Sequence, residues 1–430
     1  MSIRRLLQGL LFGALVLSAG VVRAQEAATP EEPPPDPSAA FFDDSTLGEV
    51  RLRIHTADWQ KLVDNYGSNE YYPTDFVFQG QTVYNVGIRS RGSGSRNPFK
   101  PGLRVDFNRY SGEQEFLGLT SFVLDNLYQD PTMLRERLAM KLMAKMNVDA
   151  PRERFVKLWV NSIYMGIYAA AESIDKRFLK RAQGLDADGY IFEYKWQDKW
   201  LFNYLGSELE PYEARFAART HENESSSTLQ GPIEDFVRAV NESSDVIRDI
   251  GPFLRIQTFL RELAVDTFLA DWDGLVGDFG INNFYLYRVP NGKESQFIPW
   301  DKDFTFKAKD YPVWPDGMNE NVLVQKLLDR SDLRDYYFNA LLECARLAEE
   351  RVGEPGADGA LPPPWLEQEV ERQYQQIRQA AHDDGHKPVG NEVFDAEVEV
   401  LREFARFRPG FVRDFVAGRR GTASSESVRR

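Results

Sequence analysis

The sequence of 430 residues contains one cysteine and four histidines. A single cysteine, Cys344, excludes an intramolecular disulfide, and its place in a helical pattern predicts a core residue. Four scattered histidines offer no zinc-type cluster. No Gly-x-Ser-x-Gly elbow occurs, so nothing supports a serine-hydrolase triad. The formal charge of -14 argues against nonspecific binding to nucleic acid, whose backbone is itself negative.

Long apolar runs are also scarce, and the one that stands out lies near the N-terminus. Arg4 and Arg5 precede an apolar run at residues 6–19, and small residues follow up to Ala24. This order predicts a secretory signal peptide at residues 1–24. No later stretch is long and apolar enough to span a membrane, so we expect no stable membrane insertion after cleavage. The protein is therefore predicted to be secreted, periplasmic or on the cell surface.

Composition and pattern then divide the rest of the chain. Residues 25–46, rich in Ala, Glu and Pro, are interpreted as a linker, with order expected to begin near Leu47. Residues 47–175 read as a β-rich N-terminal lobe, and residues 176–417 as a mostly helical C-terminal lobe. Residues 418–430 are predicted to be a disordered basic tail. The expected strands are 49–55, 74–78, 82–91, 154–160 and 165–171, and the later expected helices are 322–328, 333–351, 365–382 and 394–406.

A helix is predicted to open at Asp130 and Pro131, because Asp is a favoured N-cap and Pro is favoured at the first helical position. Apolar residues recur along the stretch that follows. Glu136 and Arg137 fall in the predicted first turn, where we expect them to be solvated. The alternative is that a charged residue of this turn pairs across to Lys100, as kinases pair a helix Glu with a strand Lys.

A basic loop rich in Gly and Ser joins two expected strands at residues 91–102. Flexible backbone amides beside Arg and Lys side chains suit a phosphate group. The alternative is a solvated hairpin that carries surface charge. Lys100 stands beside Pro101 and Gly102, where a core position is not expected.

The central stretch runs from Phe253 to Phe306. Its apolar spacing predicts a buried helix that ends near Asp271, followed by a hairpin of two strands, 284–289 and 295–300. The hairpin delivers Asp301 and Asp303. Carboxylates are disfavoured at a helix C-terminus and in apolar surroundings, so a divalent cation is a natural compensation if the hairpin folds back onto the helix.

Helix, loop with Asp and Asn, hairpin and then Asp is the order of parts in a protein-kinase active site. The usual signatures are missing, because no His-Arg-Asp precedes the loop. The triplet Asp278-Phe279-Gly280 stands before the hairpin, so we interpret it as coincidence.

Several motifs together resemble those of the spore-coat-protein-H (CotH) kinase family, and they occur in the family's order from about Val86 to Phe306. The motifs are Lys100-Pro-Gly-Leu-Arg104-Val-Asp-Phe-Asn, Phe116-Leu-Gly-Leu, Tyr128-Gln-Asp130-Pro131-Thr-Met-Leu-Arg135, Val148-Asp-Ala-Pro151-Arg152, Asn161-x-x-Tyr164-Met-Gly166-Ile-Tyr168, Glu172-x-x-Asp175-x-x-Phe178-Leu, Trp272-Asp273-Gly274, Asn283-Phe-Tyr-Leu-Tyr and Ile298-Pro-Trp300-Asp301-x-Asp303.

The resemblance implies an α+β fold: a divergent protein-kinase-like arrangement of a β-rich and a mostly helical lobe. It implies phosphate transfer from ATP to Ser or Thr of exported or cell-surface proteins, with Mg²⁺ or Mn²⁺. Asp273 matches the catalytic loop Asp. Asn283, Asp301 and Asp303 match metal-binding positions.

For the nucleotide, the resemblance implies that Lys100 or Arg104 meets the phosphates and that Glu172 lies where the cleft turns between the lobes. One departure concerns the base. The loop from Asp273 to Asn283 is longer than the kinase spacing, which Asp278 would satisfy.

Three other functions remain open at this stage. The chain could be a pseudokinase that binds without transfer, because fold does not guarantee function. It could be a structural surface or coat-assembly protein with a cation-stabilised acidic site. It could also be a phosphohydrolase, since magnesium carboxylate sites serve hydrolysis as well.

Overall fold

The computed structural model describes residues 36–184, 188–356 and 359–427, with side chains up to residue 420. The predicted leader at residues 1–24 and most of the linker lie outside the described residues. Among the helices that are described, none combines the length and the apolar character needed to cross a membrane.

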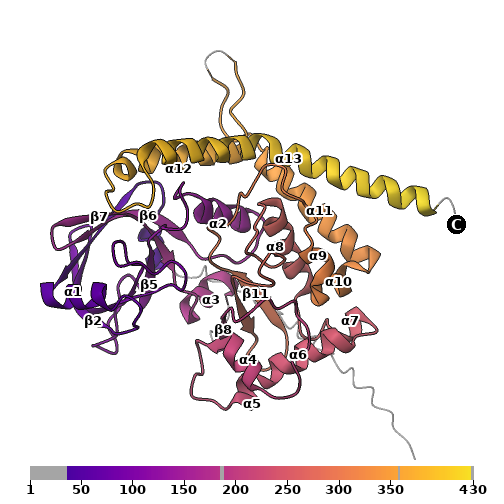
Figure 1. Ribbon diagram of the computed structural model, residues 1–430, viewed down its shortest axis with the longest axis horizontal. Coiled ribbons are helices and arrows are strands. Elements are labelled where there is room, and N and C mark those ends of the chain that lie inside the picture. The colour runs from indigo at the N-terminus through magenta and orange to yellow at the C-terminus, as the bar shows by residue number, and fades with distance from the viewer. Residues whose placement is uncertain (1–35, 185–187, 357–358, 428–430) are drawn as a thin grey trace, which may run out of the picture. The chain divides into compact units, whose positions relative to one another are not determined.

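The first part of the described chain is a closed barrel in the order β1-β2-β3-β4-β5-β7-β6 (Figure 1). All neighbouring pairs are antiparallel except β1 and β6, which are parallel and close the barrel. The strands are β1 (Gly48–Ile54), β2 (Tyr72–Phe78), β3 (Gln81–Ser90), β4 (Leu103–Asp106), β5 (Ser121–Asp125), β6 (Glu153–Val160) and β7 (Ile163–Glu172).

Alternation of buried and exposed residues is clearest in β1, whereas β5 and β7 are buried along nearly their whole length. In β1, Val50, Leu52 and Ile54 are buried while Arg51 and Arg53 face outward. Closing the sheet removes its unpaired edges, and the inward side chains fill the interior. The interior is rich in phenylalanine rings in edge-to-face contact.

The predicted linker is partly wrong, because order begins before Leu47. Residues Pro37–Ala40 form a short 3₁₀ helix, and the chain that follows enters the barrel core. Phe41 is fully buried and contacts four other phenylalanine rings besides Phe42. An extended linker would leave the rings of Phe41 and Phe42 in water. Their burial in the barrel core is favourable, so this segment is ordered.

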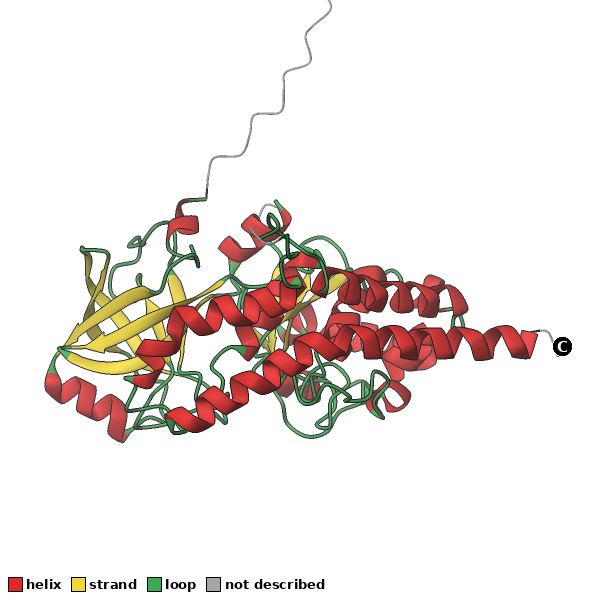
Figure 2. Cartoon of the chain, turned by 90° about the horizontal axis from the view of Figure 1, so that it is seen from above, coloured by secondary structure: helices red, strands yellow, loops and turns green. Residues whose placement is uncertain are grey.

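The remaining chain is mostly helical around a four-stranded sheet in the order β11-β10-β8-β9. Figure 2 shows the barrel strands gathered together and the helices packed beyond them. These strands are β8 (Tyr190–Tyr194), β9 (Phe216–Ala218), β10 (Phe284–Arg288) and β11 (Ser295–Pro299). The helices are α1 (Thr56–Asp64), α2 (Arg135–Lys145), α3 (Lys176–Gln183), α4 (Glu210–Arg215), α5 (Ser226–Leu229), α6 (Gly231–Glu242), α7 (Val246–Asp249), α8 (Ile256–Phe268), α9 (Gly317–Glu320), α10 (Val322–Leu328), α11 (Ser331–Ala348), α12 (Trp365–His382) and α13 (Asn391–Ser427).

The α+β prediction is confirmed by this arrangement of barrel, sheet and helices. Two local details differ from expectation. Helix α2 begins at Arg135 rather than at Pro131, because Asp130 first closes a turn by accepting the Thr132 and Arg135 amides at 2.8 and 2.9 Å. The backbone of α13 continues to Ser427, so residues 418–427 belong to a helix and not to a disordered tail.

Helix α12 connects the helical part to the barrel, as Figure 1 shows where it passes β6 and β7. The Tyr164 hydroxyl at the β6–β7 turn donates to the Ala380 carbonyl at 2.8 Å. Asp384, just past α12, accepts the Ile167 amide of β7 at 3.1 Å. The end of α12 and the residues just after it are therefore anchored to β7 of the barrel.

Candidate active site

The site begins where α8 ends. The last residues of α8 are buried on nearly every side of the helix, as the apolar spacing predicted. Ala270 then adopts a left-handed φ of 55°, which turns the chain sharply. The Trp272 amide donates to the Phe304 carbonyl at 3.4 Å, and Phe306 donates to Leu269 at 2.6 Å. The segment after the hairpin therefore folds back onto the end of α8, as expected.

Asp273 is held in this loop by two amide side chains. Asn282 Nδ2 donates to Oδ1 at 2.9 Å, and Asn283 Nδ2 donates to Oδ2 at 2.9 Å and to the Asp273 carbonyl at 3.1 Å. Burial raises the pKa of Asp273, while the Asn282 bond opposes the rise. The direct side-chain partners of Asp273 are thus neutral amides, and the Lys302 charge opposes the rise in pKa more weakly than they do.

The open end of the hairpin carries the metal candidates. Phe284 pairs with Pro299, and the Trp300 amide donates to the Asn283 carbonyl at 3.1 Å, so Asn283 and Asp301 follow from neighbouring strand ends. Both adopt left-handed backbone, with φ of 58° for Asn283 and 55° for Asp301. Such conformations persist only where the surroundings impose them, and they concentrate at functional sites.

Burial and mutual repulsion both act on the carboxylates at this place. Burial, followed by repulsion from Asp125 at the end of β5, raises the pKa of Asp301 to about 6. Burial and then repulsion from Asp301 raise the pKa of Asp303 well above its usual range. The main opposing charge on Asp301 is Arg91, which pairs with Asp125 at 2.9 Å and lies over the Trp300 ring.

A divalent cation fits this donor set by its chemistry. In the part of the chain that is described, no three His, Cys, Asp or Glu side chains are arranged as a ready metal site. Magnesium in phosphate-transfer sites takes one or two carboxylates and completes its shell with water and phosphate oxygens. Asp301, Asp303 and the Asn283 side-chain oxygen would hold it, and their unfavourable mutual charge would be relieved.

Lys100 occupies a place that the sequence does not suggest. Its side chain is fully buried, and its ammonium group pairs with Asp384 at 2.7 Å, also fully buried. The Tyr168 ring lies 5.3 Å from the same nitrogen. The expectation that Lys100 stands outside the core is wrong, because a partner from the distant end of the chain offsets the cost of burying it.

Arg104 lies on β4 and Glu172 at the end of β7, the two strands that flank β5 in the barrel. The Arg104 guanidinium donates to the Ser121 hydroxyl at 2.8 Å, and Arg104 is one of the charges that act on Tyr285 of β10. Glu172 is buried and forms ion pairs with Arg152 and Arg181 at 2.8 and 2.7 Å. Glu172 therefore joins the end of β7 to α3, and its carboxylate oxygens are engaged by protein cations.

Three residues near the carboxylates were missed by the sequence reasoning: Arg91, Asp125 and Glu136. The expectation that Glu136 is solvated is wrong, because it is buried. Burial, then repulsion from Glu153, raises the pKa of Glu136 well above its ordinary value. The start of a helix is normally exposed, which favoured the solvated interpretation, and Lys100, the alternative partner, pairs with Asp384.

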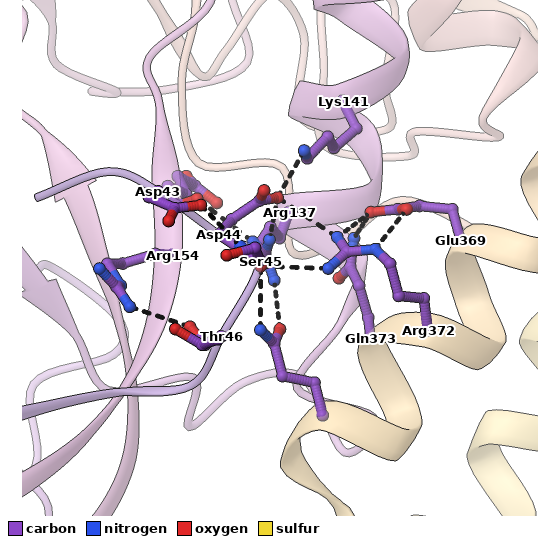
Figure 3. A network of polar contacts seen from close by, with 12 residues as sticks. Asp43, Asp44, Ser45, Thr46, Arg137, Lys141, Arg154, Glu369, Arg372 and Gln373 are labelled. Atoms are coloured by element: carbon purple, nitrogen blue, oxygen red, sulfur yellow. Dashed lines mark hydrogen bonds and ion pairs between the residues drawn. The ribbon is translucent and has the colours of Figure 1, made fainter. Parts of the chain in front are cut away.

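Arg137, the next residue, was also expected to be solvated and is buried. Figure 3 shows the reason: Asp44, from the segment before β1, forms ion pairs with Arg137 and Lys141 of α2 and with Arg372 of α12. The Asp44 carbonyl also accepts Gln376 at 2.9 Å. This N-terminal segment thereby fixes the helix that presents Glu136.

Asp278, the other candidate base, is exposed, and its amide donates to the Trp272 carbonyl at 2.8 Å. It borders a cavity of about 250 Å³ whose walls include Tyr311, Trp314 and Asp316. Asp278 is thus exposed at the surface, whereas Asp273 is buried and bonded to Asn283.

Comparison with known proteins places these features in a family. The model described as "CotH kinase protein" matches residues 88–412. The chain is 25% identical over 388 residues to the inner spore coat protein H of Bacillus subtilis, which covers 87% of this chain and 98% of that protein.

Two fungal proteins are more distant. The invasin CotH3 of Rhizopus delemar is 22% identical over 73% of this chain, and the spore coat protein homolog 1 of the same organism is 21% identical over 71%. The chain spans about half the length of these fungal relatives. Among solved structures, the Helicobacter pylori proinflammatory kinase CtkA matches 82% of this chain and 92% of its own, at 12% identity and a TM-score of 0.27. A likeness that distant adds nothing to the assignment.

Proposed function

Because the chain belongs to the CotH kinase protein family, we propose that it transfers phosphate from ATP to Ser or Thr of exported or cell-surface proteins. The observation that carries the proposal is the meeting of two elements at one place. The end of α8 supplies Asp273, and the hairpin supplies Asn283, Asp301 and Asp303. A phosphate-transfer site needs a group for the acceptor hydroxyl and separate oxygen ligands for the cation.

In this proposal Asp273 orients the acceptor hydroxyl and takes its proton. The two asparagine amides hold its carboxylate in one orientation, which reduces the reorganisation needed during transfer. Asp301, Asp303 and Asn283 hold Mg²⁺ or Mn²⁺, which supplies positive charge to the phosphate oxygens when it is bound.

The cation with the largest effect on Asp301 is Arg91. Arg104 is the second residue of β4, and it pairs with Arg89 of β3, the strand that ends just before Arg91. We assign the phosphate-facing charge to Arg91 together with Arg104, because the Arg91 side chain stays partly exposed although it pairs with Asp125, whereas Lys100 is fully buried against Asp384. Glu172 would support the cleft through Arg152 and Arg181.

The proposal includes export. It depends on the leader at residues 1–24, and relatives named for a spore coat and for invasion are consistent with an exterior location. Mass spectrometry of exported material should show an N-terminus at Gln25, and a mature protein that retains Met1 would contradict export.

The test of transfer uses labelled ATP, Mg²⁺ or Mn²⁺ and proteins encoded beside this one. Asp273→Asn should abolish transfer and leave magnesium-ATP binding largely intact, whereas Asp301→Asn should abolish both. Asp310→Asn, an exposed acidic residue, is the matched control and should behave as wild type.

Other outcomes identify the alternatives. Nucleotide binding without transfer would indicate a pseudokinase, and cation binding without nucleotide would indicate a surface or coat-assembly protein with an acidic cation site. Hydrolysis of ATP without labelling of any protein would indicate a phosphohydrolase. Transfer lost in Asp278→Asn but kept in Asp273→Asn would move the base to Asp278.

A further inference from the structure

Lys302 stands between the two proposed metal ligands Asp301 and Asp303, yet its side chain points away from the solvent-facing site. It is fully buried, and its ammonium nitrogen lies 3.1 Å from Asp266 Oδ1 and 3.0 Å from Asp271 Oδ2. Asp266 is on α8, and Asp271 is in the loop that follows it. One cation therefore joins the turn after the hairpin to the end of the helix.

The same two carboxylates also hold the loop that carries Asp273. Asp271 Oδ1 accepts the Asp273 amide at 3.1 Å, and Asp266 Oδ2 accepts the Leu275 amide at 3.1 Å. These bonds flank Gly274, where a Cβ atom would lie 2.4 Å from Asp271 Oδ2 and 2.6 Å from Asp266 Oδ2. Only glycine lets the loop approach the two carboxylates this closely.

The backbone of Lys302 is fixed as well. Thr305 Oγ1 donates to the Lys302 carbonyl at 2.7 Å. With the side chain and the carbonyl both held, the residues on either side of Lys302 have little freedom. Asp301 has a left-handed φ of 55° and a turn follows at residues 303–304, so the backbone is bent on both sides of Lys302, and its two acidic neighbours flank a residue that is fixed at both its side chain and its carbonyl.

From this geometry we propose that Lys302 is a positioning residue, which sets the placement of Asp301 and Asp303 relative to Asp273 through the carboxylates of Asp266 and Asp271. The inference rests on the proposed function for its meaning. Lys302, Asp266 and Asp271 connect the proposed cation ligands to the loop that carries the proposed base, and none of the three is itself a proposed ligand or base.

Stability alone is a poor reason for such a cluster. Buried ion pairs can often be replaced by well-packed apolar residues at no cost to the fold. Outer groups that orient metal ligands, by contrast, typically change metal affinity or activity by about 10- to 100-fold when they are altered. The two explanations predict different responses of cation affinity.

The test compares wild type with Lys302→Arg, which keeps the charge but replaces a compact ammonium with a wider planar group. Circular dichroism confirms folding. Mn²⁺ affinity is measured without nucleotide by electron paramagnetic resonance, and the Mg²⁺ concentration for half-maximal transfer is measured separately. The double variant Lys302→Met/Asp266→Asn removes one charge of each sign. Where neither lysine variant folds, Asp271→Asn is measured, because it leaves the pair with Asp266 in place.

The control for general destabilisation is Arg154→Met. Arg154 is a buried cation whose partners, the Phe41 and Thr46 carbonyls, lie in the segment before β1. We expect Mn²⁺ affinity to fall at least about tenfold in the Lys302 variants and half-maximal Mg²⁺ to rise in parallel. Both should stay at the wild-type value in Arg154→Met, whatever its stability.

A folded Lys302 or Asp271 variant with wild-type Mn²⁺ affinity and wild-type Mg²⁺ dependence would overturn the inference. The proposed function fails separately: wild-type protein that binds Mn²⁺ but transfers no phosphate rejects the kinase activity. In that case Mn²⁺ affinity of the variants alone decides the positioning role.

Discussion

Substitution of Lys100 by methionine separates a buried structural lysine from a phosphate-binding one. The change removes the partner of Asp384 while nearly preserving side-chain length. Both side chains of the pair are fully buried, at 2.7 Å. Removing one partner of a buried ion pair typically costs about 3–5 kcal/mol, because the other charge is left uncompensated.

The lower end of this range applies here, since Asp384 keeps two other donors. Its carboxylate accepts the Ile167 amide at 3.1 Å and the His386 amide at 2.8 Å. We therefore expect Lys100→Met to lower the free energy of unfolding by about 3 kcal/mol. The double variant Lys100→Met/Asp384→Asn should recover most of this loss, because no unpaired charge remains buried.

Urea unfolding followed by circular dichroism measures the four members of this cycle. Lys309→Met is the control, since Lys309 pairs with Glu403 at 2.9 Å on the surface and should lose less than about 1 kcal/mol. Folded Lys100→Met should bind magnesium-ATP as wild type does. A variant of wild-type stability with weakened nucleotide binding would refute the structural role and restore the phosphate role.

Three further predictions concern other buried contacts. Burial raises the pKa of Glu262 to about 8, so between pH about 4.5 and 8 the folded protein holds a proton that the unfolded chain has released, and stability falls as pH rises. Glu262→Gln should remove this dependence, and its gain over wild type should grow by up to about 1.4 kcal/mol per pH unit in unfolding titrations across that window. Gly166 has a φ of 102°, and a Cβ there would lie 2.1 Å from Asp384 Oδ2. Gly166→Ala should therefore cost about 2 kcal/mol or more in thermal unfolding, with Gly112→Ala, which faces open space, as its neutral control. Asp44→Asn should cost about 1–3 kcal/mol, because it weakens bonds to three basic side chains of two helices, and equal urea midpoints for variant and wild type would contradict that role.

Local patterns were enough to predict much of the architecture. Alternation identified β1, the turn at residues 161–162 identified the hairpin of β6 and β7, and apolar helical spacing identified α8 with its end near Asp271. The turn at residues 290–292 correctly predicted the hairpin of β10 and β11. These signals depend on residues within a few positions of one another, so they can be read without knowing the fold.

The same patterns predicted the carboxylates but not their partners. The order of Asp273, Asn283 and Asp301 in the chain already indicated a site, because a helix followed by a hairpin returns to its own end. The roles of Asp273, Asn283, Asp301 and Asp303 stay predictions until cation and nucleotide binding are measured. The structure adds that Asn283 holds Asp273 and that Asp125 raises the pKa of Asp301.

Only the tertiary structure decided which charged side chains are already engaged inside the protein. Lys100 pairs with a residue 284 positions away, and Lys302 pairs with Asp266 and Asp271, more than 30 positions away. Glu136 looked solvated, yet it is buried. The sequence by itself determined the strands, the central helix and the order of the carboxylates, because periodicity and turns are local. Whether a charged side chain is exposed or paired in the interior depends on burial and on partners distant in sequence, which come together only once the chain has folded.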